Sequence, residues 1–283
     1  MTLVPTLRDA GECALVAEFG DRIDPDVADR VLAFDRAVRA AGLPGLRETV
    51  PTYRSLMLHY DPGIVSRSEL AAALGAVDPE AVAAPPPRRW RVPVCLEGEH
   101  AEDLGLVCEA LGIGRDEAVA ALLGSAMRLT MYGFAPGFAY LGGLDPRLTI
   151  ARRATPRPRM PAGSLLIAGG QASLASVAMP TGWYVVGRTP VAMFDPDDRP
   201  MFPFEVGDRL LLEPVDAAAF ERLAREGARP AQVDREMGPG SPRLRRCGRD
   251  EGREQVASVP LVPDRRAEDG AEPGPVPDRV PGA

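Results

Sequence analysis

Fourteen residues near the middle of the chain, from Met131 to Leu144, restrict its fold more than any other stretch. They read MYGFAPGFAYLGGL and contain four glycines, one proline and four aromatic residues. Glycine permits left-handed backbone and close approach of other groups, whereas proline fixes φ and removes a hydrogen-bond donor. Large rings add rigid contact area. The combination indicates either a shaped loop that binds a ligand or a glycine-kinked corner of a β-barrel whose aromatic residues fill the core.

The residues around and after this stretch predict an all-β region. From Met127 onward the hydrophobic period is two, which is typical of a half-buried strand. Glycine or proline separates the short apolar runs that follow. The expected strands are 148–151, 164–168, 174–178, 183–186, 191–194 and 209–215. Many short strands at even spacing predict an antiparallel barrel or sandwich.

Residues 1–85 predict a small α/β domain with the split, ferredoxin-like order β-α-β-β-α-β. One helix begins after Asp24 as N-cap, with Pro25 in its first position, and ends at Gly42. A capping box from Ser66 to Glu69 opens a second helix. The expected strands are 13–19, 46–50, 54–60 and 92–96.

The rest of the chain divides at two further points. Residues 83–89 are expected to form a stiff linker, because consecutive prolines favour an extended backbone. Residues 86–220 form the second domain, in which two short helices with apolar stripes precede the barrel. Residues 221–283 contain no aromatic residue and balance 12 acids with 12 arginines. This last segment is predicted to be a disordered tail.

Composition excludes several classes of protein. No run of about 18 apolar residues is present, so no membrane span is expected. The N-terminus lacks the basic segment and apolar stretch of a signal peptide. Four cysteines lie far apart, and the two histidines are too few for a zinc site. The chain is therefore expected to be cytoplasmic, with reduced cysteines and no metal.

Charge is distributed unevenly along the chain. All 33 basic residues are arginine, so a Walker lysine is absent and any ATP is not held in a P-loop of this chain. Residues 126–190 contain seven arginines and one acid, Asp145, a local net charge of +6. Such an excess suits a small anion, for example a carboxylate or a phosphate. Because the whole chain has a formal net charge of −7, a nucleic-acid partner is not expected.

Five blocks of sequence occur in an order that resembles the 5-oxoprolinase B subunit family, also described as allophanate hydrolase subunit 1 or sporulation histidine-kinase inhibitor. The blocks are 133–144, 152–164, 167–171, 187–190 and 194–196, and residues 53–62 are similar to the family's N-terminal domain. The resemblance covers about residues 10–216. It implies an α+β protein, with a small α/β N-terminal domain followed by a cyclophilin-like antiparallel β-barrel. The chain departs from the family at Leu122, where a histidine is usual. It also departs over 172–182, where GGQTGIYP becomes GGQASLAS (169–176) and PGGW becomes PTGW (180–183).

The resemblance also implies a function. Family members act in a complex with a C-type subunit of related fold and an A-type subunit, and together these convert 5-oxo-L-proline to L-glutamate with ATP. Two alternatives remain open at this point. The chain could inhibit a sensor histidine kinase by binding it, or it could belong to an allophanate or urea-type carboxyltransferase-amidohydrolase.

Four polar residues are candidates for binding a small carboxylate substrate. Arg188 lies in a Gly-Arg-Thr-Pro turn, and a guanidinium binds a carboxylate through two parallel hydrogen bonds. The alternative for Arg188 is a surface salt bridge. Arg157 and Arg159 lie among three prolines, where they could contact an anion, a partner or only solvent. Gln171 follows two glycines that would let a ligand approach its amide, or that simply form a tight bend.

Three aromatic residues complete the set of candidates. Phe134, Phe138 and Tyr140 could line a substrate pocket or fill the barrel core. No Ser-His-acid or Cys-His combination is visible, so the sequence identifies no catalytic residue.

Overall fold

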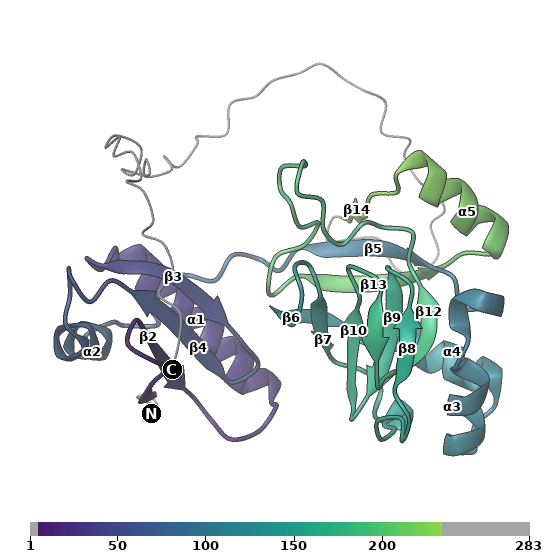
Figure 1. Ribbon diagram of the computed structural model, residues 1–283, viewed down its shortest axis with the longest axis horizontal. Coiled ribbons are helices and arrows are strands. Elements are labelled where there is room, and N and C mark those ends of the chain that lie inside the picture. Colours follow the sequence, from purple (N-terminus) through teal and green to yellow (C-terminus); the bar gives the residue numbers. More distant parts are fainter. Residues whose placement is uncertain (1–4, 234–283) are drawn as a thin grey trace, which may run out of the picture. The chain divides into compact units, whose positions relative to one another are not determined.

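A computed structural model of the chain describes residues 5–233 (Figure 1). The strands form a four-stranded sheet, an eight-stranded sheet and a two-stranded sheet. Most strand pairs are antiparallel, and helices pack outside the sheets, which is the α+β arrangement predicted from the sequence.

The four-stranded sheet is built from the first 60 residues and has the order β1-β2-β4-β3. Its strands are β1 (Thr6–Asp9), β2 (Ala14–Glu18), β3 (Leu46–Pro51) and β4 (Ser55–Tyr60). Helix α1 (Pro25–Ala41) packs on β3 and β4, and Figure 1 shows it lying across the sheet. Helix α2 (Arg67–Gly75) begins at the capping box that the sequence predicts.

The ends of α1 also follow the sequence. The Asp24 side chain accepts a hydrogen bond from the N–H of Asp26, and Gly42 ends the helix with φ of 57°. A left-handed residue at this position is favourable for glycine because it has no Cβ. The buried side of α1 contributes Val31, Phe34 and other apolar residues to a core shared with β2 and β4.

The ferredoxin-like order was wrong in one respect. Its last strand was expected at 92–96, but β5 (Arg89–Val94) belongs to the eight-stranded sheet, where it pairs in parallel with β13 (Arg209–Pro214). The edge beside β2 is taken instead by β1, which was not predicted from the sequence. Val92 and Val94 of β5 are buried in the core of the eight-stranded sheet. Three consecutive prolines, 85–87, separate them from α2 along the chain.

The eight-stranded sheet has the order β12-β9-β10-β7-β6-β13-β5-β14. Its remaining strands are β6 (Arg128–Tyr132), β7 (Ala139–Gly142), β9 (Ser164–Ala168), β10 (Gln171–Leu174), β12 (Tyr184–Arg188) and β14 (Ala231–Gln232). A separate antiparallel pair is formed by β8 (Arg157–Met160) and β11 (Met179–Thr181).

The expected closed β-barrel is not found among the described residues. The eight-stranded sheet ends at β12 and β14, and an isolated bridge between Cys95 and Arg188 joins its first strand to the chain beyond β5. Three expected strands were also wrong. Leu148 ends a short 3-10 helix (Pro146–Leu148) and residues 149–151 form no strand, nor do residues 191–194. Of the expected strand 174–178, only Leu174 lies in a strand, at the end of β10.

Three helices accompany this sheet. Helix α3 (Leu104–Leu111) packs beside β12, and α4 (Arg115–Gly124) packs against β13. Helix α5 (Ala217–Glu226) follows β13, so the predicted tail does not begin at residue 221. The remainder of that predicted tail, from residue 234 onward, lies outside the described residues.

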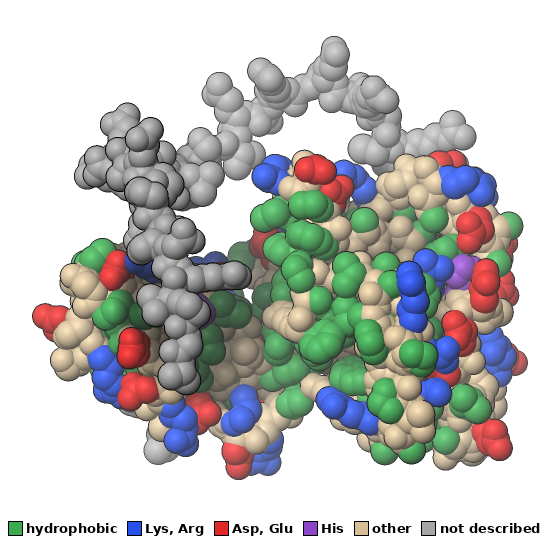
Figure 2. All heavy atoms as spheres, viewed as in Figure 1, with side chains coloured by type: hydrophobic (Ala, Val, Ile, Leu, Met, Phe, Trp, Pro, Cys, Tyr) green, Lys and Arg blue, Asp and Glu red, His purple; other side chains and the backbone are tan. Residues whose placement is uncertain are grey.

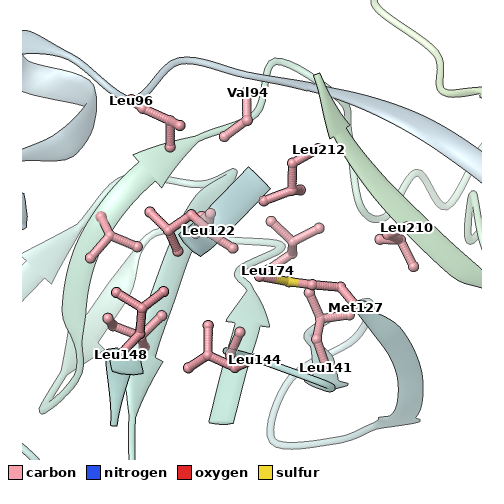
Figure 3. Packing of buried hydrophobic residues seen from close by; sticks show 14 of the residues in the cluster. Val94, Leu96, Leu122, Met127, Leu141, Leu144, Leu148, Leu174, Leu210 and Leu212 are labelled. Carbon is pink, nitrogen blue, oxygen red and sulfur yellow. The ribbon is translucent and has the colours of Figure 1, made fainter. Parts of the chain in front are cut away.

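The core of the eight-stranded sheet is rich in leucine (Figure 3). Leu122 from α4, Leu141 from β7 and Leu210 from β13 are fully buried there. Burial of one such side chain contributes about 1.5–3 kcal/mol. Leu122, which stands where the family motif has histidine, therefore serves as a core residue.

No helix between residues 5 and 233 combines the length and the apolar character needed to cross a bilayer. Nor do these residues contain a group of three His, Cys, Asp or Glu side chains arranged to hold a metal ion.

Candidate functional site

The backbone at the end of β12 holds Arg188 in place. Arg188 N–H donates to the carbonyl of Cys95 at 2.9 Å, and Cys95 N–H donates back to the carbonyl of Arg188 at 2.8 Å. Gly163 lies so close to Thr189, the residue after Arg188, that a Cβ on Gly163 would be 2.3 Å from the Thr189 carbonyl oxygen. Because Gly163 also has φ of +79°, glycine is required here both for backbone conformation and for space.

The Arg188 guanidinium is held on two sides. Its Nε donates to the carbonyl oxygen of Ala162 at 2.9 Å. Its Cζ lies 5.2 Å from the centre of the Phe220 ring, a cation–π distance. Arg188 forms no ion pair with any residue from 5 to 233. Its charge is therefore not neutralised by a described carboxylate.

Arg188 lines a cavity of about 220 Å³. Most of the lining is apolar and comes from the loop after β12 and from α5. The lining includes Ala162, Ser176, Pro190, Phe194 and Phe220. The Ser176 hydroxyl is buried and has no hydrogen-bond partner between residues 5 and 233. Two residues of the lining thus carry polar groups that lack a partner among residues 5–233: the Arg188 cation has no carboxylate, and the buried Ser176 hydroxyl has no hydrogen bond.

Arg157 has a different environment. Its guanidinium donates to Asp103 Oδ1 at 2.6 Å and also contacts the Glu102 carboxylate. Arg153 donates to the same Asp103 oxygen at 2.8 Å, and the N–H of Val185 donates to Oδ2 at 2.9 Å. Asp103 is 1% exposed, so this network ties the start of α3 to β8 and β12.

Arg159 is on the same strand as Arg157 but is exposed. Residues two apart on a strand share a face, so both side chains lie on one side of β8. Within residues 5–233, Arg159 makes no hydrogen bond or ion pair. It is a free surface cation.

Gln171 lies away from Arg188. The tight bend is present: Gly169 and Gly170 both have positive φ, as a two-residue hairpin turn between β9 and β10 requires. Gln171 pairs with Ala168, at one end of β9, whereas Arg188 pairs with Ser164, at the other. At about 3.3 Å per residue, the two sites are separated by roughly 13 Å along β9.

The aromatic candidates form a row. Phe134 contacts Phe138 with a centroid distance of 5.7 Å, Phe138 contacts Tyr140 at 5.1 Å, and Tyr140 contacts Trp183 at 6.1 Å. Phe138 is buried in a small core cluster with Trp183. Burial also raises the pKa of Tyr140. Phe138, Tyr140 and Trp183 therefore fill the interior more than they line an open pocket.

Phe134 is the exception in this row. It is 78% exposed and has φ of 70°, the left-handed region that non-glycine residues seldom adopt. Figure 2 shows hydrophobic side chains gathered on the face of the sheet that carries β6 and β7, the strands on either side of this loop.

The structure brings together residues that were not predicted from the sequence. Ser176 and Phe220 line the cavity beside Arg188, and Asp103 accounts for the setting of Arg157. The sequence offers only faint signals for them. Ser176 falls in the block that departs from the family motif, and Phe220 is the last aromatic residue of the chain.

Comparison with known proteins identifies relatives along most of the chain. The family model "Carboxyltransferase domain, subdomain C and D" matches residues 5–204. The 5-oxoprolinase B subunit of Bacillus subtilis is 32% identical over 224 residues, which are 74% of this chain and 92% of that protein. The 5-oxoprolinase B subunit of Escherichia coli O157:H7 is 31% identical over 222 residues, again 74% and 92%.

Solved structures with a similar fold are also found. The crystal structure of TTHA0988 has 31% identity and a TM-score of 0.65, and the match covers 75% of this chain but only 41% of that longer chain. The urea amidolyase of Kluyveromyces lactis has a TM-score of 0.68 at 18% identity over 82% of this chain and 16% of its own, a likeness in fold alone. The chain therefore belongs to the family of carboxyltransferase domains, subdomain C and D, together with the B subunits of 5-oxoprolinase.

Proposed function

We propose that the chain is the B-type subunit of a 5-oxoprolinase-like complex that hydrolyses 5-oxo-L-proline to L-glutamate with ATP. In this reaction water adds across the lactam C–N bond, which yields the γ-carboxylate and the free amino group of glutamate. A C-type and an A-type subunit are the proposed partners. The name shared by the Bacillus and Escherichia relatives supports membership in a complex of several subunits.

One observation carries the role of this chain. Arg188 is a fixed cation without a carboxylate partner among residues 5–233, and it lines a cavity large enough for a small acid. We assign to it the contact with the substrate carboxylate. A guanidinium in a largely apolar lining attracts an anion more strongly than one in open water, because the local dielectric constant is lower.

ATP does not fit this site. The cavity of about 220 Å³ is smaller than the roughly 300–1,000 Å³ of sites for drug-sized ligands. The chain also has no lysine to hold phosphates in a P-loop. We therefore place ATP on a partner subunit.

The other candidates take different places in this proposal. Arg157 holds the protein together through Asp103 and Glu102. Arg159, Gln171 and Phe134 lie outside the Arg188 cavity, and contact with substrate or with a partner subunit remains a prediction for them.

Reconstitution tests the proposed function. The purified chain is mixed with its C-type and A-type partners, and glutamate and phosphate release are measured with 5-oxo-L-proline and ATP. Both products are expected only when all subunits are present, and the chain alone should be inactive. Consumption of allophanate without turnover of 5-oxoproline would contradict the substrate. Inhibition of histidine-kinase autophosphorylation, with no turnover of either compound, would contradict the enzymatic role.

A further inference from the structure

We propose that Ser176 and Arg188 together form a carboxylate subsite, and that Phe220 positions the arginine within it. The identity of the substrate rests on the proposed function, but the chemical class of the ligand does not. The subsite takes the carboxylate of a small, non-nucleotide acid, with the rest of the ligand against the apolar wall of the cavity.

Two residues that line one cavity, Ser176 and Arg188, carry this inference. The Ser176 hydroxyl is buried and finds no hydrogen-bond partner among the residues that the structure describes, whereas buried polar groups in native proteins are nearly always paired. Within the described part of the chain, the Arg188 guanidinium forms one hydrogen bond, from Nε to the Ala162 carbonyl. A carboxylate has two acceptor oxygens and no donor, so it complements an O–H and a guanidinium at the same time.

The surroundings restrict how a ligand can reach Arg188. One face of the guanidinium is covered by Phe220, and Nε is occupied. The two Nη groups are left for the ligand. Apolar lining from Pro190, Val191 and Phe194 offers no competing carboxylate.

Phe220 also contacts a second ring. The centre of the buried His100 imidazole lies 4.1 Å from the centre of the Phe220 ring. The start of α5 is also fixed, because the N–H of Ala217 donates to Glu97 Oε1 at 3.0 Å. Phe220 therefore acts through Arg188, as a positioning residue.

Binding to the full-length chain tests the subsite directly. 5-Oxo-L-proline is titrated by calorimetry and by NMR, and 2-pyrrolidinone, the same lactam without a carboxylate, serves as the control ligand. Saturable binding of 5-oxo-L-proline and at least tenfold weaker binding of 2-pyrrolidinone are expected, since hydrogen bonds to charged groups contribute about tenfold or more each. Equal binding of both compounds, or no saturable binding of either, would overturn the subsite.

Matched variants distinguish the loss of a contact with the carboxylate, from Ser176 or Arg188, from the general effects of removing a buried hydroxyl or a positive charge. Ser176→Ala should weaken binding about tenfold, whereas Ser173→Ala should not, although Ser173 is also a buried serine with an unpaired hydroxyl. Arg188→Ala should abolish measurable binding, and Arg225→Ala, which removes an exposed charge from α5, should leave it intact. Wild-type affinity in Ser176→Ala would overturn its role.

The role of Phe220 is tested by a measurement that a purely structural role would not change, the affinity for 5-oxo-L-proline. Phe220→Tyr should bind 5-oxo-L-proline nearly as well as the wild type. Phe220→Leu should lose some thermal stability, because the ring is buried, and should bind several-fold more weakly when affinity is measured well below its melting temperature. Equal affinity in Phe220→Leu would overturn the positioning role. Binding that depends on Ser176, in a chain whose complex shows no turnover, would refute the proposed function and leave the subsite intact. Turnover by a complex whose B-type chain binds no carboxylate would refute the subsite and leave the proposed function intact.

Discussion

Arg157 and Arg153 donate to the same oxygen of Asp103, at 2.6 and 2.8 Å. The Asp103 carboxylate is buried, so two guanidinium groups compensate one charge that water does not reach. Removing one partner from a buried ionic network costs free energy, because a charge remains with fewer hydrogen bonds.

Arg157→Ala should accordingly lower the free energy of unfolding by about 1–3 kcal/mol, below the 3–5 kcal/mol of a fully unpaired charge because Arg153 remains. Arg159→Ala, two residues away and exposed, should change it by no more than about 0.5 kcal/mol. Urea denaturation measures both. Equal stability of the two variants would show that the Asp103 network does not hold these elements together.

The two left-handed glycines on either side of β9 offer a steric comparison. Gly163 and Gly169 have φ of +79° and +58°, but a Cβ would be 2.3 Å from the Thr189 carbonyl oxygen at Gly163 and within 4 Å of nothing at Gly169. Gly169→Ala should cost about 1–2 kcal/mol for backbone strain alone. Gly163→Ala should cost roughly 1–3 kcal/mol more because atoms overlap. Equal unfolding free energies would contradict the close backbone approach beside Arg188.

Phe134 and Phe138 belong to one loop but should respond oppositely to truncation. Phe138→Ala removes a buried ring and should destabilise the chain by about 3–5 kcal/mol. Phe134→Gly removes an exposed ring from left-handed backbone, so stability should stay the same or rise by about 1 kcal/mol. Thermal unfolding distinguishes them, and a large loss of stability in Phe134→Gly would show that the ring packs against the protein.

Cysteine reactivity should follow burial. Burial raises the pKa of the Cys95 thiol above its usual range. Because the thiolate is the reactive form, a raised pKa leaves less of it at pH 7.5 and slows alkylation. Cys13 is exposed and should react with iodoacetamide before Cys95 does. Peptide mapping over time measures both sites, and equal rates would show that Cys95 is accessible.

Much of the fold could be predicted because it depends on local signals. The N-cap at Asp24, the capping box at Ser66 and strand β9 follow from residue type and spacing. The placement of β5 could not, because residues 89–94 pair with residues 209–214, more than a hundred positions away. Such long-range pairing leaves no mark in a local hydrophobic period.

The candidate site was predictable only in part. A local excess of arginine pointed to the stretch that contains Arg188 and Arg157. It did not distinguish Arg188, which has no carboxylate partner among residues 5–233, from Arg157, which Asp103 and Glu102 neutralise. That distinction depends on which acids the fold brings near each arginine. Ser176 was missed for a related reason: a serine becomes unusual only when it is buried without a partner.

Turnover by Arg188 variants in the assembled complex tests the central claim most directly. Arg188→Ala should lower kcat/KM more than tenfold, in line with the roughly 2–5 kcal/mol lost when one member of a buried charged pair is truncated, while the melting temperature stays close to that of the wild type. Arg188→Lys should restore only part of the activity, because an ammonium lacks the planar fork. Arg225→Ala controls for the loss of one positive charge. If Arg188→Ala hydrolyses 5-oxo-L-proline with the kcat/KM of the wild type, Arg188 does not bind the substrate carboxylate.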